Sequence, residues 1–295
     1  MPHRKGELGL KVALAGLGTM GLPIARRLLA TGIDLGVWNR SPAPAAALLS
    51  DGARVADSFA ALLADHAIVL LMLVNEDAAD AVLQRSGDEL GLDVAGKLIV
   101  QMGTTSLDHS RALSCAITTG GGRYVEAPIS GSRVPAERGE LVAMIAGAAD
   151  DKARVAPLFA RFTASIVDCG EVPQALAMKL ASNFLLGPIM VGLVDATAFA
   201  RRAGLDLALF AEVLLGGQMA SPIVATKLAK LLADDHRPHA ALGNVILSAD
   251  TALKAGHALG LDQTLLDHCR TRFVAAIDAG LADEDITALE KMLRR

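Results

Sequence analysis

A glycine-rich turn between an apolar run and a helix-like segment is the feature that most constrains this 295-residue chain. The apolar run starts at Lys11, and the helical segment continues to Ala30. Between them the backbone must turn sharply, which lets it approach a pyrophosphate closely and direct the free N–H groups of a helix start toward its charge. We predict that the turn binds a dinucleotide, and a purely structural glycine-rich turn is the alternative. Its residues are Gly16, Leu17, Gly18, Thr19, Met20 and Gly21.

The end of the next apolar segment, 35–38, indicates which dinucleotide is bound. Dinucleotide-binding folds for NAD place an acidic residue near this point, on the ribose hydroxyl. Here the segment runs into Asn39, Arg40 and Ser41, without a carboxylate. A guanidinium and two neutral hydrogen-bonding side chains suit a 2′-phosphate, which a carboxylate would repel. We therefore predict NADP(H), with a solvated Arg40 in an ordinary turn as the alternative.

The apolar pattern changes at about residue 170. Before it, short apolar runs at 67–73, 98–102, 124–127, 141–145 and 166–168 alternate with helical segments, as in crossover units on a largely parallel sheet. After it, Ala- and Leu-rich segments have helical spacing near 173–202, 206–215, 221–232, 240–259, 262–280 and 284–294. The predicted fold is α/β: a doubly wound Rossmann-type domain over 1–170, followed by an all-α domain over 171–295.

Composition excludes several classes of function. A net charge of −4 provides no basic field for nucleic acid. The three cysteines are widely spaced and odd in number, so they indicate thiols of a reducing compartment and neither a disulfide framework nor a metal site. Residues 1–10 resemble a loose leader more than a signal peptide, which favours a cytoplasmic location. The apolar stretch 183–195 is short and interrupted by Gly187, Pro188 and Gly192, so it predicts a buried helix and no membrane span.

Two further groups of residues suggest chemistry. Ser130, Gly131 and Ser132 follow an apolar strand at the predicted carboxyl edge of the sheet, where backbone N–H groups and hydroxyls could hold an anionic group such as a carboxylate. A plain loop is the alternative. Lys179 and Asn183 are four residues apart near the start of the first long helix, so they share one face.

The neighbours of Lys179 are apolar, and a lysine beside buried surface loses hydration of its charged form. Its pKa then falls from about 10.4 toward the working pH, which suits proton transfer by a general acid. The alternative is a lysine that extends to solvent from a helix end.

In this order and at these distances, the motifs resemble the β-hydroxyacid dehydrogenase family, which includes 3-hydroxyisobutyrate dehydrogenases and glyoxylate and succinic semialdehyde reductases. The resemblance covers nearly the whole chain. It implies an NADP-type loop at Asn39–Ser41 and cofactor contacts at Leu73, Val74 and Thr104. It also implies substrate binding at Ser130–Ser132, with Lys179 as the catalytic lysine and Asn183 as its companion. The resemblance further implies a long helix that joins the domains, a nicotinamide between the domains, and a homodimer or homotetramer.

The chain departs from the family pattern at two places. The segment before Lys179 is usually rich in glycine, but here it has Pro173 and Ala175. Family members tend to carry a lysine immediately before an aspartate in the last third, where this chain has Ala249 and Asp250. Lys254 is one helical turn further along and could reach the same space, but we expect it to be an ordinary exposed lysine on a helix. The second departure affects the substrate class more than the fold.

The function we expect is NADPH-dependent hydride transfer to a small carboxylated aldehyde or keto acid, or from a 3-hydroxy acid, with Lys179 as general acid or base. An imine reductase on the same scaffold is the nearest alternative. A redox-inactive NADP-binding protein is the alternative from another class.

Overall fold

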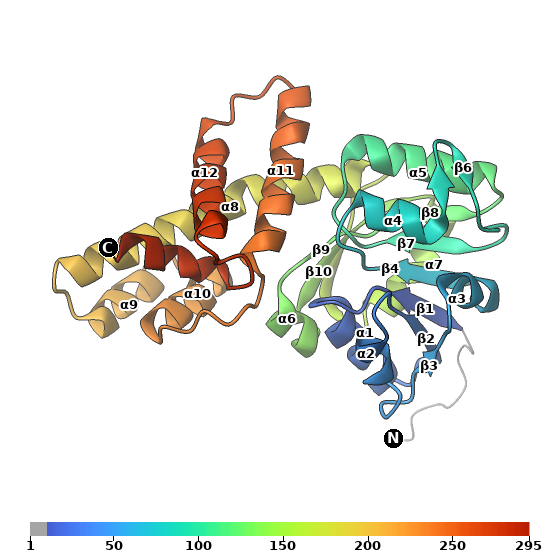
Figure 1. The fold of residues 1–295 in the computed structure, drawn as a ribbon, viewed down its shortest axis with the longest axis horizontal. Helices are drawn as coiled ribbons and strands as arrows, with labels where there is room; N and C mark the ends of the chain where they lie inside the picture. Colours follow the sequence, from blue (N-terminus) through green and yellow to red (C-terminus); the bar gives the residue numbers. More distant parts are fainter. Residues whose placement is uncertain (1–10, 295) are drawn as a thin grey trace. The chain divides into compact units, whose positions relative to one another are not determined.

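The computed structural model describes residues 11–294, so the predicted loose leader over 1–10 lies outside the described residues. The chain forms two compact units that divide between Lys179 and Leu180. Figure 1 shows the elements of both units along the chain.

The first unit is built on a nine-stranded sheet with the order β11-β10-β8-β7-β4-β1-β2-β3, in which β9 pairs with β10. The strands from β3 to β8 along this order are parallel, and β10 is antiparallel to β8 and β9 but parallel to β11. A separate hairpin joins β5 and β6. The strands are β1 (Val12–Ala15), β2 (Leu35–Trp38), β3 (Arg54–Val55), β4 (Ile68–Leu71), β5 (Arg85–Ser86), β6 (Glu89–Leu90), β7 (Leu98–Gln101), β8 (Arg123–Glu126), β9 (Ile129–Ser130), β10 (Leu141–Gly147) and β11 (Thr163–Asp168).

Alternate residues of β1 enter two different cores, because successive side chains of a strand point to opposite faces of the sheet. Val12 and Leu14 pack in one cluster with residues of α1, whereas Ala13 and Ala15 pack in the other with residues of α3 and α5. Both faces of the sheet are therefore covered by helices, as a parallel sheet requires. The helices of this unit are α1 (Gly21–Ala30), α2 (Pro42–Ala46), α3 (Phe59–Asp65), α4 (Glu76–Leu83), α5 (Leu107–Thr119), α6 (Arg133–Arg138) and α7 (Ala149–Phe159).

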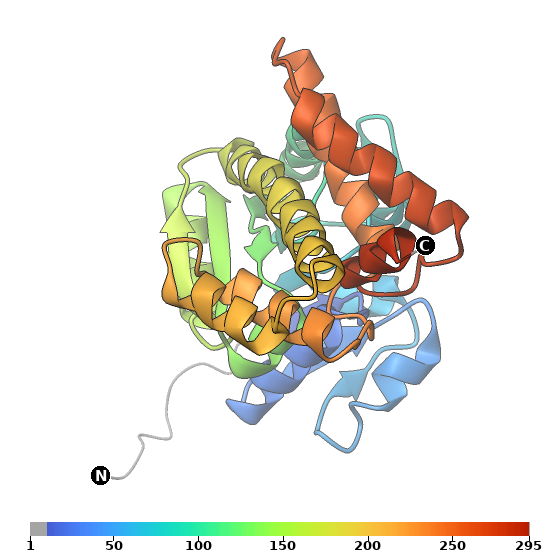
Figure 2. The ribbon, with the colours of Figure 1, turned by 90° about the vertical axis from the view of Figure 1, so that its left-hand side faces the viewer.

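The second unit is helical. Two of its helices, α11 and α12, run side by side as a hairpin, which Figures 1 and 2 both show. The last element that the structure describes is a 3₁₀ helix at Ile286–Leu293. The sequence predicts a helical segment over 284–294, but its spacing does not distinguish a 3₁₀ helix from an α-helix. The α-helices are α8 (Gln174–Arg202), α9 (Leu207–Gly216), α10 (Pro222–Leu232), α11 (Leu242–Ala258) and α12 (Thr264–Asp278).

The apolar stretch 183–195, predicted to be a buried helix, lies in the long helix α8 and is buried only in part. Met190 and Val194 are buried, but Leu185 on the same helix is 65% exposed. By length and apolar composition α8 could cross a membrane, and 44% of its most apolar window is buried inside the protein. A core helix with one face left open has the same properties.

Charged side chains are buried where the chain end packs in the second unit. Lys227 Nζ lies 2.7 Å from both carboxylate oxygens of Asp285, and both side chains are buried. Glu290 is fully buried and accepts hydrogen bonds from Arg201 at 2.7 Å and from Arg294 at 2.9 Å. These pairs tie the 3₁₀ segment to α8 and α10.

The predicted fold class is confirmed: an α/β unit with a mostly parallel sheet precedes an all-α unit, and α8 runs from one into the other. The elements that the sequence did not predict are the two-residue strands β3, β5, β6 and β9. Such short strands contain too few residues to display a period.

Replacing Lys227 by methionine should lower the free energy of unfolding by about 3–5 kcal/mol, because it leaves the Asp285 carboxylate buried without its cation. Chemical denaturation measures this loss. Lys254→Met is the matched control, since Lys254 is exposed on α11, and we expect it to stay within about 0.5 kcal/mol of wild type. Equal stability of the two variants would contradict the structural role of the Lys227 pair.

Candidate dinucleotide and substrate site

The predicted cofactor residues gather at one edge of the sheet in the first unit. Strands β1, β2, β4 and β7 are parallel neighbours in matching register, so their carboxyl ends meet at the same edge. The glycine turn follows β1, Asn39 follows β2, Leu73 follows β4 and Thr104 follows β7. Ligands of doubly wound folds bind at this edge.

Close packing explains the first and third glycines of the turn. Gly16 has a φ of +93°, and a Cβ there would lie 2.3 Å from the carbonyl oxygen of Met72. A Cβ at Gly21 would lie 1.8 Å from the carbonyl oxygen of Gly16. A side chain at Gly16 would therefore push the end of β1 away from the end of β4, and a side chain at Gly21 would push the start of α1 away from the end of β1.

The middle glycine has a different role, because no atom of residues 11–294 lies within 4 Å of a Cβ built at Gly18. Beside this open space, α1 begins at Gly21 without a side-chain cap at Met20 and without an acidic residue in its first turn. The N–H groups of such a helix start carry partial positive charge and suit a pyrophosphate. The turn therefore fits a dinucleotide.

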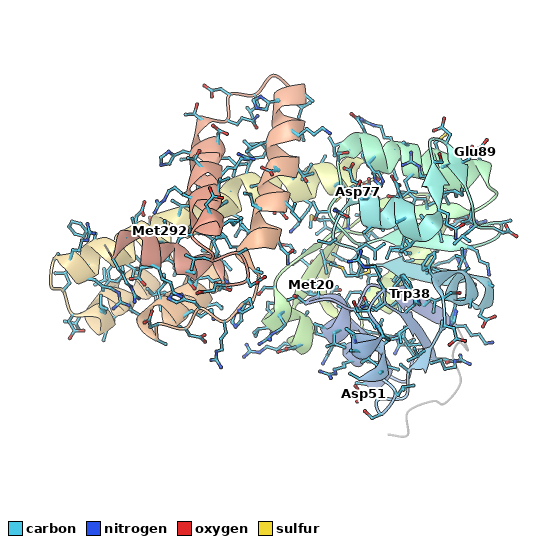
Figure 3. The ribbon with its side chains drawn as sticks, in the orientation of Figure 1. Met20, Trp38, Asp51, Asp77, Glu89 and Met292 are labelled. Carbon is cyan, nitrogen blue, oxygen red and sulfur yellow. The ribbon has the colours of Figure 1, made fainter. Side chains whose placement is uncertain are left out.

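The loop after β2 is tied to the glycine turn. The Asn39 side chain accepts a hydrogen bond from the Leu17 amide at 2.8 Å and donates one to the Ser41 carbonyl at 2.9 Å. Figure 3 labels Trp38, the last residue of β2, and Met20 at the start of α1. Arg40 and Ser41 are exposed beside Asn39. Asn39 thus orders the turn, and Arg40 is free to contact a phosphate.

The ends of β4 and β7 come close to each other. A Cβ at Gly103 would lie 2.4 Å from the Leu73 carbonyl oxygen, so this approach requires glycine. Leu73 and Thr104 are half-buried, and Val74 is 58% exposed. All three predicted residues are placed where a bound dinucleotide could contact them.

The predicted substrate loop is partly a strand. The sequence predicts a loop at Ser130, but the structure places Ser130 in β9, paired with Val142 of β10. Gly131 follows with a φ of +134°, and Ser132 precedes α6 without capping it. Residues with this conformation can still present hydroxyl groups, but the sheet holds the Ser130 backbone more firmly than a loop would.

Lys179 and Asn183 lie one turn apart near the start of α8, as the sequence predicts for one helix face. Loss of hydration lowers the pKa of the half-buried Lys179 to about 8. The Asn183 side chain is only 8% exposed, and its Nδ2 has no hydrogen-bond partner among the described residues. A lysine that can exchange a proton near neutral pH therefore lies beside a buried amide with an unused donor.

The structure shows the surroundings of the residues at which this chain differs from the family pattern. Ala249 is buried on α11, and the next residue, Asp250, forms an ion pair with Arg270. Lys254 is exposed, so it does not occupy the buried position of Ala249. Ala175 is fully buried in the first turn of α8, where it packs against Met144.

Two polar groups at the same edge were not predicted. Gln101, the last residue of β7, is 1% exposed, and neither polar atom of its amide has a partner among the described residues. The Thr105 hydroxyl is also buried and unpartnered there. The sequence does contain a signal for Gln101, because it is a polar residue at the end of an otherwise apolar strand. Glu126, which ends β8 in the same way, is another such residue.

Comparisons with known proteins show the family to which both parts of the chain belong. Residues 11–170 match the NAD-binding domain of 6-phosphogluconate dehydrogenase, and residues 174–293 match the NAD-binding domain of NADP-dependent 3-hydroxyisobutyrate dehydrogenase. The chloroplastic glyoxylate/succinic semialdehyde reductase 2 of Arabidopsis thaliana is 28% identical over 99% of this chain and 82% of its own length.

Two solved structures show the same fold. A 3-hydroxyisobutyrate dehydrogenase from Salmonella typhimurium superposes with a TM-score of 0.86 at 24% identity, covering 96% of this chain and 99% of its own. An imine reductase from Pseudomonas sp. superposes with a TM-score of 0.63 at 22% identity, covering 95% of this chain and 98% of its own.

Gly18→Ala should weaken NADPH binding by about 10-fold or more, because the added methyl group enters the open space where a pyrophosphate would lie. The variant should fold normally, since that methyl group would meet no atom of the described part of the chain. Fluorescence titration and thermal unfolding measure the two effects. Gly192→Ala, on α8, also adds a methyl group in open space and should leave binding unchanged. Unchanged NADPH affinity in Gly18→Ala would exclude the turn as the binding site.

Proposed function

We propose that the chain, which belongs to the β-hydroxyacid dehydrogenase family of NAD(P)-dependent oxidoreductases, reduces a small carboxylated aldehyde or keto acid with NADPH, or oxidises a 3-hydroxy acid in the reverse direction. The observation that carries this proposal is the position on α8 of Lys179, whose pKa is lowered to about 8, one turn from the buried amide of Asn183, whose Nδ2 has no hydrogen-bond partner among the described residues. The relative in Arabidopsis is named as a reductase of glyoxylate and succinic semialdehyde, both small carboxylated carbonyl compounds.

The cofactor would be held by the glycine turn, the loop after β2 and the ends of β4 and β7. The residues are Gly16, Leu17, Gly18, Thr19, Met20, Gly21, Asn39, Arg40, Ser41, Leu73, Val74 and Thr104. Arg40 favours the 2′-phosphate of NADP(H), because it is exposed at the position where an NAD site has a carboxylate. When bound, the nicotinamide supplies or accepts the hydride.

The side chains of this chain would supply binding and proton transfer. Ser130, Gly131 and Ser132 would bind the substrate carboxylate, and Asn183 would donate a hydrogen bond that fixes the orientation of the substrate. The Lys179 ammonium would donate a proton to the carbonyl oxygen as negative charge develops there. In the reverse direction, the neutral amine would accept the hydroxyl proton.

Reduction of an imine is a second candidate, and Ala249 favours it because the family lysine is missing at that position. The presence of Lys179 favours a carbonyl substrate. A panel of glyoxylate, semialdehydes and cyclic imines, followed by the absorbance of NADPH, distinguishes them. Tight NADPH binding without turnover on any compound would instead indicate a redox-inactive NADP-binding protein.

We further propose a homodimer or homotetramer in the cytoplasm. Apolar side chains are exposed on two helices of the second unit, with Phe199 of α8 at 70% and Val213 of α9 at 71%. Apolar surface of this kind is typical of subunit contacts. The substrate is expected to be a small anionic molecule, and neither a nucleic acid nor a membrane is part of the proposal.

Lys179→Ala should reduce turnover by about 10²–10⁴-fold, the usual contribution of a general acid. The affinity for NADPH should remain nearly unchanged, because the residues proposed to bind it lie on other elements. Steady-state kinetics and a binding titration measure the two effects. Equal turnover in wild type and variant would remove Lys179 from the mechanism.

The rate of the wild-type enzyme should also depend on pH through Lys179. Reduction requires the ammonium form, so kcat/KM for reduction should fall as the pH rises through about 8. Oxidation requires the neutral amine, so kcat/KM in that direction should rise over the same range. Both inflections should disappear in Lys179→Ala, and a flat profile for the wild type would contradict the assignment.

Arg40→Ala should raise the Kd for NADPH by about 10-fold while changing the Kd for NADH little, because a guanidinium binds the 2′-phosphate that NADH lacks. Calorimetric titration with both nucleotides tests this preference. Arg26→Ala serves as a control, since Arg26 lies on α1 and pairs with Asp51. An equal loss of affinity for NADH and NADPH would contradict the proposed role of Arg40.

A further inference from the structure

A buried carboxylate lies against the first turn of the helix that carries Lys179. Glu126, at the carboxyl end of β8, is fully buried, and its Oε2 accepts a hydrogen bond from the Leu176 amide at 3.3 Å. The backbone of Ala175 also donates to this carboxyl group. Both amides belong to the start of α8, where N–H groups have no acceptor within the helix. Glu126 therefore caps α8 from a neighbouring strand.

The other carboxylate oxygen is anchored in the core of the first unit. The Ser110 hydroxyl of α5 donates a hydrogen bond to Glu126 Oε1, and Ser110 Oγ lies 2.8 Å from the Tyr124 hydroxyl. Since the Ser110 proton is directed to Glu126, the Tyr124 hydroxyl must donate to Ser110. Burial raises the pKa of Tyr124, so its hydroxyl stays protonated. The chain Tyr124, Ser110, Glu126 and Leu176 thus has a fixed direction of hydrogen bonds.

Burial raises the pKa of Glu126, while the hydrogen bonds from Ser110 and from the start of α8 oppose this effect. A carboxylate uses both oxygens as acceptors, as observed here, and a helix N-terminus favours the negative charge. A residue that served only to fill the core would not need a charged group at this position. The arrangement links the sheet to one specific turn of α8.

That turn also sets the position of Lys179. Lys179 follows Ala175 by four residues and Leu176 by three, so it lies above them on the same side of the helix. Its lowered pKa is caused by loss of hydration. A carboxylate that fixes Ala175 and Leu176 could therefore affect Lys179 only through the position of the helix start.

We propose that Glu126 is a positioning residue: its carboxylate fixes the first turn of α8 and so holds the Lys179 amine where it can transfer a proton to the substrate. This inference rests on the proposed function of Lys179. A displacement of about 1 Å in a reacting group can reduce a rate by about 10²-fold. Small movements of the helix start therefore have large kinetic effects.

The test compares Glu126→Gln with Asp151→Asn. The glutamine keeps one acceptor oxygen but loses the charge and the second acceptor. Asp151 is also a buried carboxylate of the first unit, paired with Arg123 and remote in sequence from α8, so its variant matches the loss of a buried charge. Four quantities are measured: kcat and KM for reduction, the Kd for NADPH, and the pH midpoint at which acetic anhydride labels Lys179, which mass spectrometry detects.

For Glu126→Gln we expect kcat to fall by about 10- to 100-fold with little change in the Kd for NADPH. The labelling midpoint of Lys179 should rise from about 8 toward the ordinary lysine value, because a displaced helix start hydrates the amine. Asp151→Asn should lose stability without changing kcat or the labelling midpoint. Ser110→Ala removes the hydrogen bond to Glu126 Oε1 but leaves the carboxylate in place. It should lower kcat and raise the labelling midpoint by less than Glu126→Gln does.

Unchanged kcat and an unchanged labelling midpoint in Glu126→Gln would overturn the proposal, even if the variant is less stable. If Glu126→Gln does not fold, the same two measurements on Ser110→Ala decide. Failure of the proposed function has a separate signature, which is full turnover in Lys179→Ala. The labelling midpoint would still show, in that case, whether Glu126 holds the amine in place.

Discussion

The nucleotide-binding unit depends on close backbone contacts at two glycines: Gly16 lies against Met72, and Gly21 lies against Gly16. Because neither residue has a side chain, the start of α1 lies directly over the end of β1, and the carbonyl groups of Gly16 and Met72 occupy the space that a Cβ would need. This approach brings an uncapped helix N-terminus to the edge where the parallel strands end. Everything proposed for the cofactor follows from that placement.

Much of this arrangement could be predicted from the sequence. Short apolar runs separated by helical segments predicted the central strands, and the change of period near residue 170 predicted the all-α part. The motif Gly16 to Gly21 has a strong local signature, since glycine is required where backbones approach closely. The position of Lys179 and Asn183 on one helix face follows directly from their spacing.

Other features depended on tertiary contacts that no local pattern encodes. Ser130 belongs to a strand because β10 lies beside it, and β10 comes from a segment eleven residues later. Glu126 and Ser110 meet only because α5 packs against β8. Helix α8 has apolar residues on all sides, which is the pattern of a buried helix. The described residues nevertheless leave some of these side chains exposed, such as Leu185 and Phe199. Periodicity cannot distinguish these cases.

The Glu290 contacts have a consequence for the order in which the second unit can fold during synthesis. Glu290 is fully buried and accepts hydrogen bonds from Arg201 of α8 and from Arg294. The nascent chain must therefore carry Arg201 without this acceptor until residue 290 has been made. We expect α8 to reach its native packing against the 3₁₀ segment only after that point.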